Sequence, residues 1–211
     1  MIEAILFDLD GVLVDACDWH YEALNYALKE IVNLEISLED HQKIYNGLPT
    51  RVKLDKLGLK EQDRHRIIAL KQRYTKDLIK MNLKESADKV SLMSWLKAND
   101  YKIGCVTNSI KETAHLMLEL SGVKGFLDII ITNEDVINNK PFPECYNKAV
   151  KDLGILPDNI LCVEDSSTGI MAVRSSNITN LMVVKNAIDV NLKNIRKALN
   201  EDFNTYGRLG Q

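Results

Sequence analysis

The stretch Ile5-Leu6-Phe7-Asp8-Leu9-Asp10-Gly11-Val12, near the start of the 211-residue chain, does most to decide its fold. Its apolar run is typical of a buried strand, and the run ends in two aspartates one residue apart. Residues i and i+2 of an extended chain point to the same side, so Asp8 and Asp10 are expected to face one place while Leu9 turns into the core. Two carboxylates about 4 Å apart repel by roughly 4 kcal/mol at an effective dielectric of 20, so a cation or a shared proton must offset the repulsion. The segment is therefore a candidate reaction centre.

The rest of the chain alternates strand-like apolar runs with helical patterns. The strand-like runs are Ile2–Phe7, Lys102–Thr107, Leu127–Thr132, Ile160–Glu164 and Asn180–Val184. The helical patterns are Ala87–Asn99, Lys111–Ser121, Pro143–Leu153 and Thr168–Ser176, with a short helix expected at Asn191–Leu199. This alternation predicts an α/β fold, a Rossmann-like, doubly wound parallel sheet with helices on both faces. In such sheets ligands bind at the carboxyl ends of the strands.

An unusually long segment, residues 8–101, separates the first strand from the second, although a simple crossover needs far fewer residues. It holds two helical patterns, with apolar residues spaced from Trp19 to Ile31 and from Ile67 to Leu78. We therefore expect an α-helical cap domain at residues 16–82, inserted into an α/β core formed by residues 1–15 and 83–211. The basic run Arg64–Arg73 is expected to form a solvated helix face.

Composition argues against several classes of protein. The formal net charge of −3 gives no reason to expect a nucleic acid or an anionic membrane as a partner. No apolar run approaches the roughly 18 residues that span a bilayer, and the first residues do not resemble a secretion signal. No C-x-x-C pair is present, which argues against zinc and for reduced thiols at Cys17, Cys105, Cys145 and Cys162. We therefore expect a cytoplasmic protein, and a monomer by default.

Four polar motifs are expected to meet at the carboxyl edge of the sheet. They are Asp8-Leu9-Asp10, Thr107-Asn108-Ser109, Lys140-Pro141-Phe142-Pro143 and Glu164-Asp165-Ser166-Ser167. Four carboxylates against one lysine favour a hard divalent cation, Mg²⁺ above all. The hydroxyl of Thr107 with nearby backbone N–H groups, and the point charge of Lys140, are suited to a phosphoryl group.

Each motif alone also has a purely structural interpretation. Asp-x-Asp-Gly is often a turn, Thr-Asn-Ser and Glu-Asp-Ser are often helix caps, and Lys140 could simply lie on the surface. If all four motifs were purely structural, their placement at strand ends in this order would require four separate coincidences. The joint functional interpretation is therefore favoured.

These motifs resemble those of the haloacid dehalogenase-like superfamily, over nearly the whole chain and with a helical cap between the first two motifs. The matching segments are Asp8-Leu9-Asp10-Gly11-Val12, Thr107-Asn108, Lys140-Pro141-x-Pro143 and Glu164-Asp165-Ser166-x-x-Gly169. The last of them is similar to the form in the β-phosphoglucomutase and sugar-phosphatase branch, as is the spacing of Asp15 and His20. The segment Gly47-Leu48-Pro49-Thr50-Arg51 resembles the substrate-contacting loop of that branch.

The resemblance implies catalytic and phosphate-binding roles. Asp8 would be the nucleophile that becomes an aspartyl-phosphate, and Asp10 would be the general acid and base. Thr107 and Asn108 would hold the phosphoryl oxygens. Lys140 would neutralise Asp8 and the phosphate.

The resemblance also implies a Mg²⁺ cofactor. Its ligands would be Asp8, the backbone carbonyl of Asp10, Asp165, and Glu164 either directly or through water. Before Mg²⁺ binds, crowding with Asp8 is expected to raise the pKa of Asp10.

Two residues of the insert have open roles. His20 is either an ordinary helical histidine or a residue that contacts the catalytic loop and tunes Asp10. Arg51 either contacts the phosphate or substrate or has no role in the site.

Three functions follow from these residues. The first is a Mg²⁺-dependent phosphatase that acts on a small phosphorylated metabolite, with a sugar phosphate favoured. The second is a β-phosphoglucomutase-type phosphotransferase, against which the pair Asp15-Ala16 and the form Thr107-Asn108-Ser109 weigh weakly. The third is a binding protein that kept the fold but lost catalysis, although no essential group is missing. A dehalogenase would not need the carboxylates Glu164 and Asp165.

Overall fold

The computed structural model describes residues 1–45 and 47–200. Within them lies a parallel five-stranded sheet in the order β3-β2-β1-β4-β5. Its strands are β1 (Ala4–Phe7), β2 (Lys102–Val106), β3 (Ile129–Ile131), β4 (Ile160–Glu164) and β5 (Asn180–Val183). Each falls inside one of the five predicted runs, so the predicted α/β fold with a Rossmann-like sheet is confirmed.

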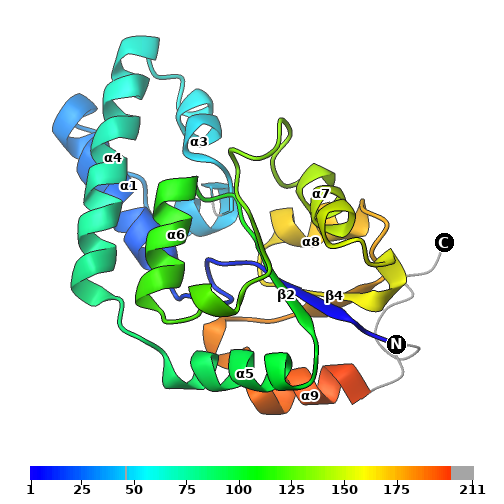
Figure 1. The fold of residues 1–211 in the computed structure, drawn as a ribbon. Helices are drawn as coiled ribbons and strands as arrows, with labels where there is room; N and C mark the ends of the chain where they lie inside the picture. The colour runs from blue at the N-terminus through cyan, green and yellow to red at the C-terminus, as the bar shows by residue number, and fades with distance from the viewer. Residues whose placement is uncertain (46, 201–211) are drawn as a thin grey trace.

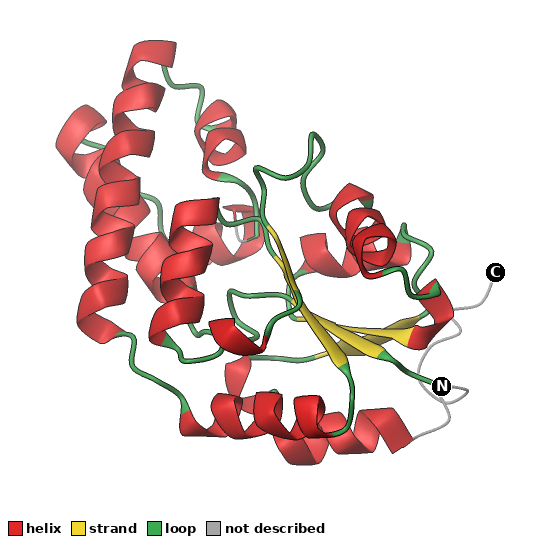
Figure 2. Cartoon of the chain, viewed as in Figure 1, coloured by secondary structure: helices red, strands yellow, loops and turns green. Residues whose placement is uncertain are grey.

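Helices cover both faces of this sheet (Figures 1 and 2). One face is covered by α5 (Ala87–Ala98), α6 (Lys111–Leu120) and α9 (Leu192–Asn200). The other face is covered by α7 (Glu144–Leu153) and α8 (Ser167–Arg174). Short 3₁₀ turns lie in the connections at η2 (Lys124–Phe126), η3 (Pro157–Asn159) and η4 (Ala187–Asp189).

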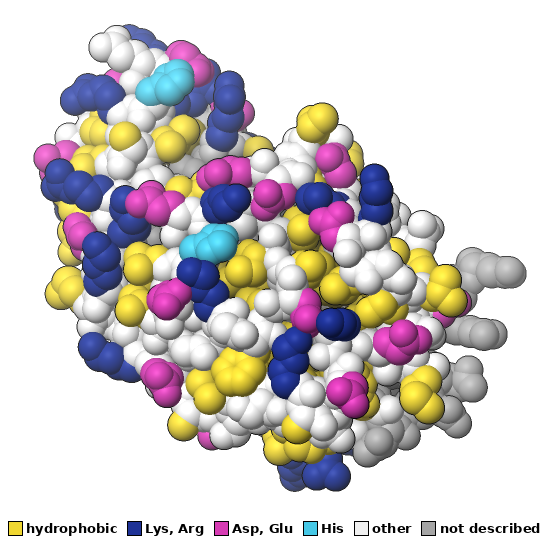
Figure 3. All heavy atoms as spheres, viewed as in Figure 1, with side chains coloured by type: hydrophobic (Ala, Val, Ile, Leu, Met, Phe, Trp, Pro, Cys, Tyr) yellow, Lys and Arg dark blue, Asp and Glu magenta, His cyan; other side chains and the backbone are white. Residues whose placement is uncertain are grey.

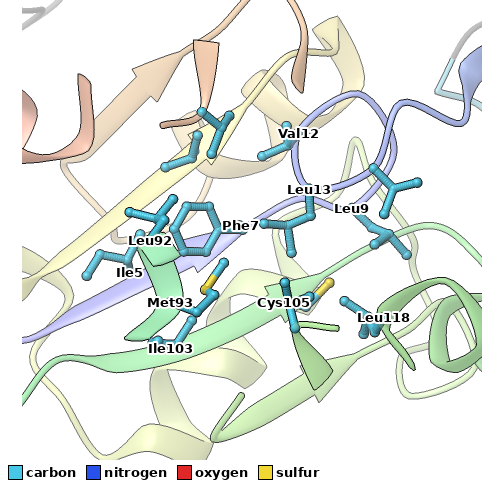
Figure 4. Close-up of a cluster of buried hydrophobic side chains, with 14 of the residues drawn as sticks. Ile5, Phe7, Leu9, Val12, Leu13, Leu92, Met93, Ile103, Cys105 and Leu118 are labelled. Atoms are coloured by element: carbon cyan, nitrogen blue, oxygen red, sulfur yellow. The ribbon is translucent and has the colours of Figure 1, made fainter. Parts of the chain in front are cut away.

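The central strand β1 contributes to the hydrophobic layers on both faces. Ile5 and Phe7 point to one side and pack with Met93 of α5 (Figure 4). Leu6 points to the other side, into the layer that contains Tyr146 of α7. Since both faces are covered, the strand is a continuous apolar run rather than an alternating one. Because β1 is buried up to Phe7, Asp8 is the first residue beyond the end of the strand.

The segment between β1 and α5 is helical in its described part. Its elements are α1 (Cys17–Val32), α2 (Leu38–Asp40), the π-helical turn η1 (His41–Tyr45), α3 (Thr50–Lys56) and α4 (Glu61–Asn82). They bury their own apolar cluster, which includes Leu24, Leu28, Leu54 and Ile67. In Figure 1 these helices stand together beside the sheet, with α1 packed along α4. A separate core of this kind supports the proposal that residues 16–82 form a cap domain.

The buried stripe of α4 differs from the predicted one. Its buried residues are Ile67, Lys71, Thr75 and Ile79, at a spacing of four. The expectation that the basic run 64–73 forms a solvated face is therefore wrong at Lys71, which is 7% exposed. A lysine can occupy such a stripe because its aliphatic stem packs while its ammonium reaches a polar pocket.

The state of the cysteines and the distribution of surface charge agree with what the composition predicts. All four cysteines lie in the described residues and carry free thiols, and Cys105 and Cys162 are buried in β2 and β4 as expected. None of the helices among the described residues is long and apolar enough to cross a bilayer. Acidic and basic side chains are interspersed over the face seen in Figure 3, in keeping with the net charge of −3.

Leu28 tests the separate core of the insert. Its side chain is 0% exposed in the apolar cluster, so Leu28→Ala should lower the free energy of unfolding by about 2–5 kcal/mol. Leu38 of α2 is 47% exposed, and Leu38→Ala should cost about 0.5 kcal/mol or less. Urea denaturation followed by circular dichroism measures both values. Equal effects would contradict a packed core in this segment.

Candidate active site

The candidate site lies where the strand order reverses. β2 and β3 lie on one side of β1, and β4 and β5 lie on the other. Open α/β sheets bind ligands beyond the carboxyl ends of the strands at such a switch point. A pocket of about 340 Å³ opens there, and its lining includes Asp8, Asp10, Thr107, Lys140 and Asp165. The structure thus brings together residues from all four predicted motifs.

Lys140 joins two carboxylates inside the protein. Its Nζ donates to Oδ1 of Asp8 (2.7 Å), to Oε1 of Glu164 (2.6 Å) and to the carbonyl of Val106 (2.7 Å). All three ammonium protons are therefore used. Burial lowers the pKa of Lys140, but the charges of Asp8 and Glu164 outweigh it and raise the pKa above its usual value. Lys140 is a fixed positive charge beside Asp8.

Glu164 is fully buried, and both of its carboxylate oxygens accept hydrogen bonds. Oε1 accepts from Lys140 and from the hydroxyl of Tyr146 (2.6 Å). Oε2 accepts from the backbone N–H of Asp165 (3.3 Å) and from the hydroxyl of Ser166 (3.4 Å). This bonding makes Glu164 a positioning group for Lys140.

Helix α8 approaches Glu164 closely at Gly169. A Cβ atom at that position would lie 2.0 Å from Oε1 of Glu164, well inside van der Waals contact. A side chain there would displace the carboxylate that holds Lys140. The glycine of the Glu-Asp-Ser-x-x-Gly motif is thus required by packing.

Asp165 offers a buried oxygen to a cation. Its Oδ1 has no hydrogen-bond partner among the described residues. Burial, followed by the charges of Glu164 and Asp10, raises the pKa of Asp165 to about 7. Ligand atoms of Asp8, Glu164 and Asp165 all lie within 4.8 Å of one another. Crowded carboxylates and an unpaired buried oxygen fit a divalent cation with oxygen ligands, such as Mg²⁺.

Asp8 and Asp10 lie in different electrostatic surroundings. Burial raises the pKa of Asp8 well above its usual value; Lys140 opposes this, and Glu164, Asp10 and Asp165 add to it. Burial also acts to raise the pKa of Asp10, but His20, Ser109 and Lys71 outweigh it through charge and hydrogen bonds, so this pKa is lowered. The expectation of a raised pKa at Asp10 is therefore wrong, because the other carboxylates cluster around Asp8.

Asp10 ends a chain of hydrogen bonds that starts in the insert. Its Oδ2 accepts from the hydroxyl of Ser109 (2.8 Å), and its Oδ1 lies 2.9 Å from Nε2 of His20. Nδ1 of His20 lies 3.3 Å from Nζ of Lys71. Because an ammonium only donates, Nδ1 is the acceptor and the Nε2–H of His20 donates to Asp10. Of the two alternatives for His20, the geometry favours contact with the catalytic loop.

The two predicted phosphate-binding residues differ in what their side chains do. Oγ1 of Thr107 accepts from the backbone N–H of Ser109 (3.0 Å), so its own O–H is available to an anion. The amide of Asn108 accepts from the backbone N–H of Lys140 (3.0 Å) and donates to the carbonyls of Lys140 and Gly47 (both 3.1 Å). Asn108 thereby joins the Lys140 loop to the insert, and an anion contact would fall to its backbone N–H.

The insert contributes cations that the sequence analysis missed. Arg51, which the sequence singled out, lies exposed in α3 and lines the pocket. Lys53 and Lys71 also line the pocket, and each is only 7% exposed. The spacing of four from Ile67 to Lys71 is the one sequence signal that could have placed Lys71 on the buried stripe. Tyr146 was likewise not expected to contact the candidate residues.

Comparisons with known proteins agree with the geometry. The model of the haloacid dehalogenase-like hydrolase family matches residues 5–183. The chain is 29% identical to the pyrophosphatase PpaX of Oceanobacillus iheyensis, over 90% of this chain and 87% of that protein. It is 26% identical to a phosphorylated carbohydrates phosphatase of Thermotoga maritima, over 89% and 88% of the two chains. The crystal structure of a β-phosphoglucomutase from Clostridium difficile superposes with a TM-score of 0.80, at 28% identity over 95% and 98% of the chains.

Gly11 tests whether Asp165 forms part of a cation site. Gly11 has φ +85°, and a Cβ atom there would lie 2.1 Å from Oδ2 of Asp165. Gly11→Ala should therefore weaken Mg²⁺ binding at least tenfold, which isothermal titration calorimetry measures. Gly58 also has a positive φ, +65°, but nothing lies within 4 Å of its Cβ position. Gly58→Ala should introduce the same backbone strain as Gly11→Ala, about 1–2 kcal/mol, but it should leave the affinity for Mg²⁺ unchanged. Equal loss in both variants would remove Asp165 from the cation site.

Proposed function

Since the chain belongs to the haloacid dehalogenase-like hydrolase family and is a hydrolase, we propose that it is a Mg²⁺-dependent phosphatase of a small phosphorylated metabolite, with a sugar phosphate favoured. The reaction would pass through an aspartyl-phosphate on Asp8. The observation that carries the proposal is the buried Lys140, bonded to both Asp8 and Glu164 beside the unpaired oxygen of Asp165.

Asp8 is the nucleophile of the proposed reaction. One of its carboxylate oxygens forms a bond to phosphorus while the bond between phosphorus and the leaving oxygen breaks. Lys140 lowers the charge repulsion between this carboxylate and the phosphate. Attack by a carboxylate divides the hydrolysis of a very unreactive ester into two easier steps.

Asp10 moves the protons. In the first step it protonates the leaving oxygen, and in the second it takes a proton from the water that attacks phosphorus and releases Asp8. The hydrogen bonds from His20 and Ser109 favour its carboxylate form, which is the form needed in the second step. For the first step, Asp10 must receive a proton before the ester bond breaks.

The other site residues bind the charged groups. Mg²⁺, when bound, would neutralise charge that develops on the transferred phosphoryl oxygens. Asp8, the backbone carbonyl of Asp10, and Asp165 would hold it, with Glu164 acting through water because both of its oxygens already accept hydrogen bonds. The hydroxyl of Thr107 and the backbone N–H of Asn108 would bind phosphoryl oxygens.

The cap proposed at residues 16–82 would cover this edge and exclude bulk water during the reaction. The contact between Asn108 and Gly47 joins the two parts beside the pocket. Free thiols and a small net charge support a cytoplasmic enzyme without a nucleic-acid partner, and we take the monomer as the working unit.

A phosphomutase is the second candidate. It is favoured by the likeness to the β-phosphoglucomutase structure at 28% identity and a TM-score of 0.80. The aspartyl-phosphate would then be attacked by a sugar hydroxyl rather than by water, and all groups on the sheet edge would keep their roles. The pair Asp15-Ala16 weighs weakly against it, as the family resemblance implies.

Asp8→Asn tests the nucleophile. The amide is a poor nucleophile of the same size, so phosphate release from an aryl phosphate should fall at least about 10³-fold. Removal of Mg²⁺ with EDTA should abolish the activity of the unmodified chain, and added Mg²⁺ should restore it. Asp152→Asn, on the far end of α7, is a matched control and should retain full activity. Activity that survives Asp8→Asn would refute the aspartyl-phosphate route.

Incubation with β-glucose 1-phosphate separates the two candidates. A phosphatase should release one inorganic phosphate for each sugar phosphate consumed, which a molybdate assay measures alongside ³¹P NMR of the sugar phosphates. Conversion to glucose 6-phosphate without phosphate release would establish the mutase instead.

A further inference from the structure

The two sides of the pocket carry opposite charge. The side formed by the sheet edge contains Asp8, Asp10 and Asp165 with one cation, Lys140. The side formed by α1, α3, α4 and the segment before α3 contains Arg51, Lys53 and Lys71. Among the described residues, this insert side contributes no carboxylate to the pocket lining. The anions of the sheet edge are accounted for by the proposed reaction, whereas the cations of the insert are not.

Lys53 is the more buried of the two pocket-lining insert cations, Arg51 and Lys53, that have no hydrogen-bond or ion-pair partner among the described residues. Its side chain is 7% exposed and lines the pocket, and within the described residues no hydrogen bond or ion pair joins it to another group. Lys71, by contrast, donates to His20. Burial, and after it the charge of Lys71, lowers the pKa of Lys53 to about 7. A buried ammonium without a partner is costly, and an anion from outside the chain would remove the cost.

The transferred phosphoryl group is not this anion. Its partners would be Lys140, Thr107 and the backbone of Asn108, all on the sheet edge. Lys53 lies on the insert side of the pocket, and from that side His20 contacts Asp10. Asp10 is the residue that would protonate the leaving group. Lys53 therefore faces the part of the substrate that leaves.

We propose that the substrate carries a second anionic group, a carboxylate or a phosphate, on its leaving part, and that the ammonium of Lys53 binds this group. The inference rests on the proposed phosphatase function, because it takes the sheet edge as the place of the transferred phosphoryl group. It makes Lys53 a specificity-determining residue and, among phosphorylated metabolites, favours those whose leaving part carries a second negative charge.

Binding of non-hydrolysable phosphonates tests the inference. Phosphonoacetate and 3-phosphonopropionate carry a carboxylate, ethylenediphosphonate carries a second phosphonate, and methylphosphonate and ethylphosphonate are their uncharged-tail counterparts. Dissociation constants are measured by isothermal titration calorimetry with saturating Mg²⁺. We expect at least one doubly charged compound to bind tenfold or more tightly than its counterpart, a difference of about 1.4 kcal/mol. The best compound also shows whether a carboxylate or a phosphate is preferred and at what distance.

Variants of Lys53 assign that preference to one side chain. Lys53→Met keeps the length and the aliphatic stem but removes the charge, so the tenfold preference should fall below threefold. Lys53→Arg should restore part of it. Lys56→Met, on the exposed side of the same helix, removes a matched charge and should leave both affinities unchanged. Thermal melting verifies that each variant is folded, and Lys53→Gln replaces Lys53→Met if the latter is not.

Each outcome has a defined meaning. Equal affinities for charged and uncharged tails in the unmodified chain would overturn the inference, as would a preference that survives in the folded charge-removing variant. Failure to release phosphate from any ester would overturn the proposed function instead. In that case a preference lost with Lys53 would still establish a binding site for a doubly anionic ligand.

Discussion

The three hydrogen bonds of the Lys140 ammonium are the interaction on which the rest of the site depends. They join the ends of three adjacent strands, because Asp8 follows β1, Val106 ends β2 and Glu164 ends β4. A buried ammonium and two buried carboxylates would each be costly alone, and together they compensate one another. Tyr146 adds a fourth element, since its hydroxyl donates to Glu164 and its ring lies 5.1 Å from Nζ. The hydrophobic layers on both faces of the sheet hold these strand ends in register.

Much of this arrangement could be predicted from the sequence, for a simple reason. Buried parallel strands are continuous apolar runs, and the polar residue that ends each run must lie at one edge of the sheet. Asp8, Thr107 and Glu164 could therefore be placed together without coordinates. The buried lysines of the insert could not be predicted, because their burial depends on the direction in which side chains point from a helix. Lysine is usually a surface residue, yet Lys71 lies at a buried position. Lys53 is also buried, and it directly precedes the buried Leu54 on a short helix. The pKa of Asp10 was misjudged because its repulsion by Asp8 was weighed without the hydrogen bonds from His20 and Ser109.

The pocket divides its tasks between its two sides. The sheet edge holds groups that any phosphoryl transfer would need, and their positions are fixed by strands whose residues are almost all buried. The helical insert holds Arg51, Lys53 and Lys71, whose charges would act on the remainder of the ligand in the proposed reaction. His20 is the exception, because it lies in the insert yet contacts Asp10. A change in the insert can therefore alter both which ligand is admitted and how Asp10 handles its proton.

Gly169 has a consequence for attempts to make the protein more robust. A glycine inside a helix usually costs about 1 kcal/mol relative to alanine, and its replacement is a standard route to higher melting temperatures. An engineer scanning helix interiors would select this position in α8 early. Here the methyl group would occupy the space of the Glu164 carboxylate and so reach the partner of Lys140. Alanine at this position would therefore disturb the charge balance around Asp8, and thermostabilised libraries of this fold should leave that glycine unchanged.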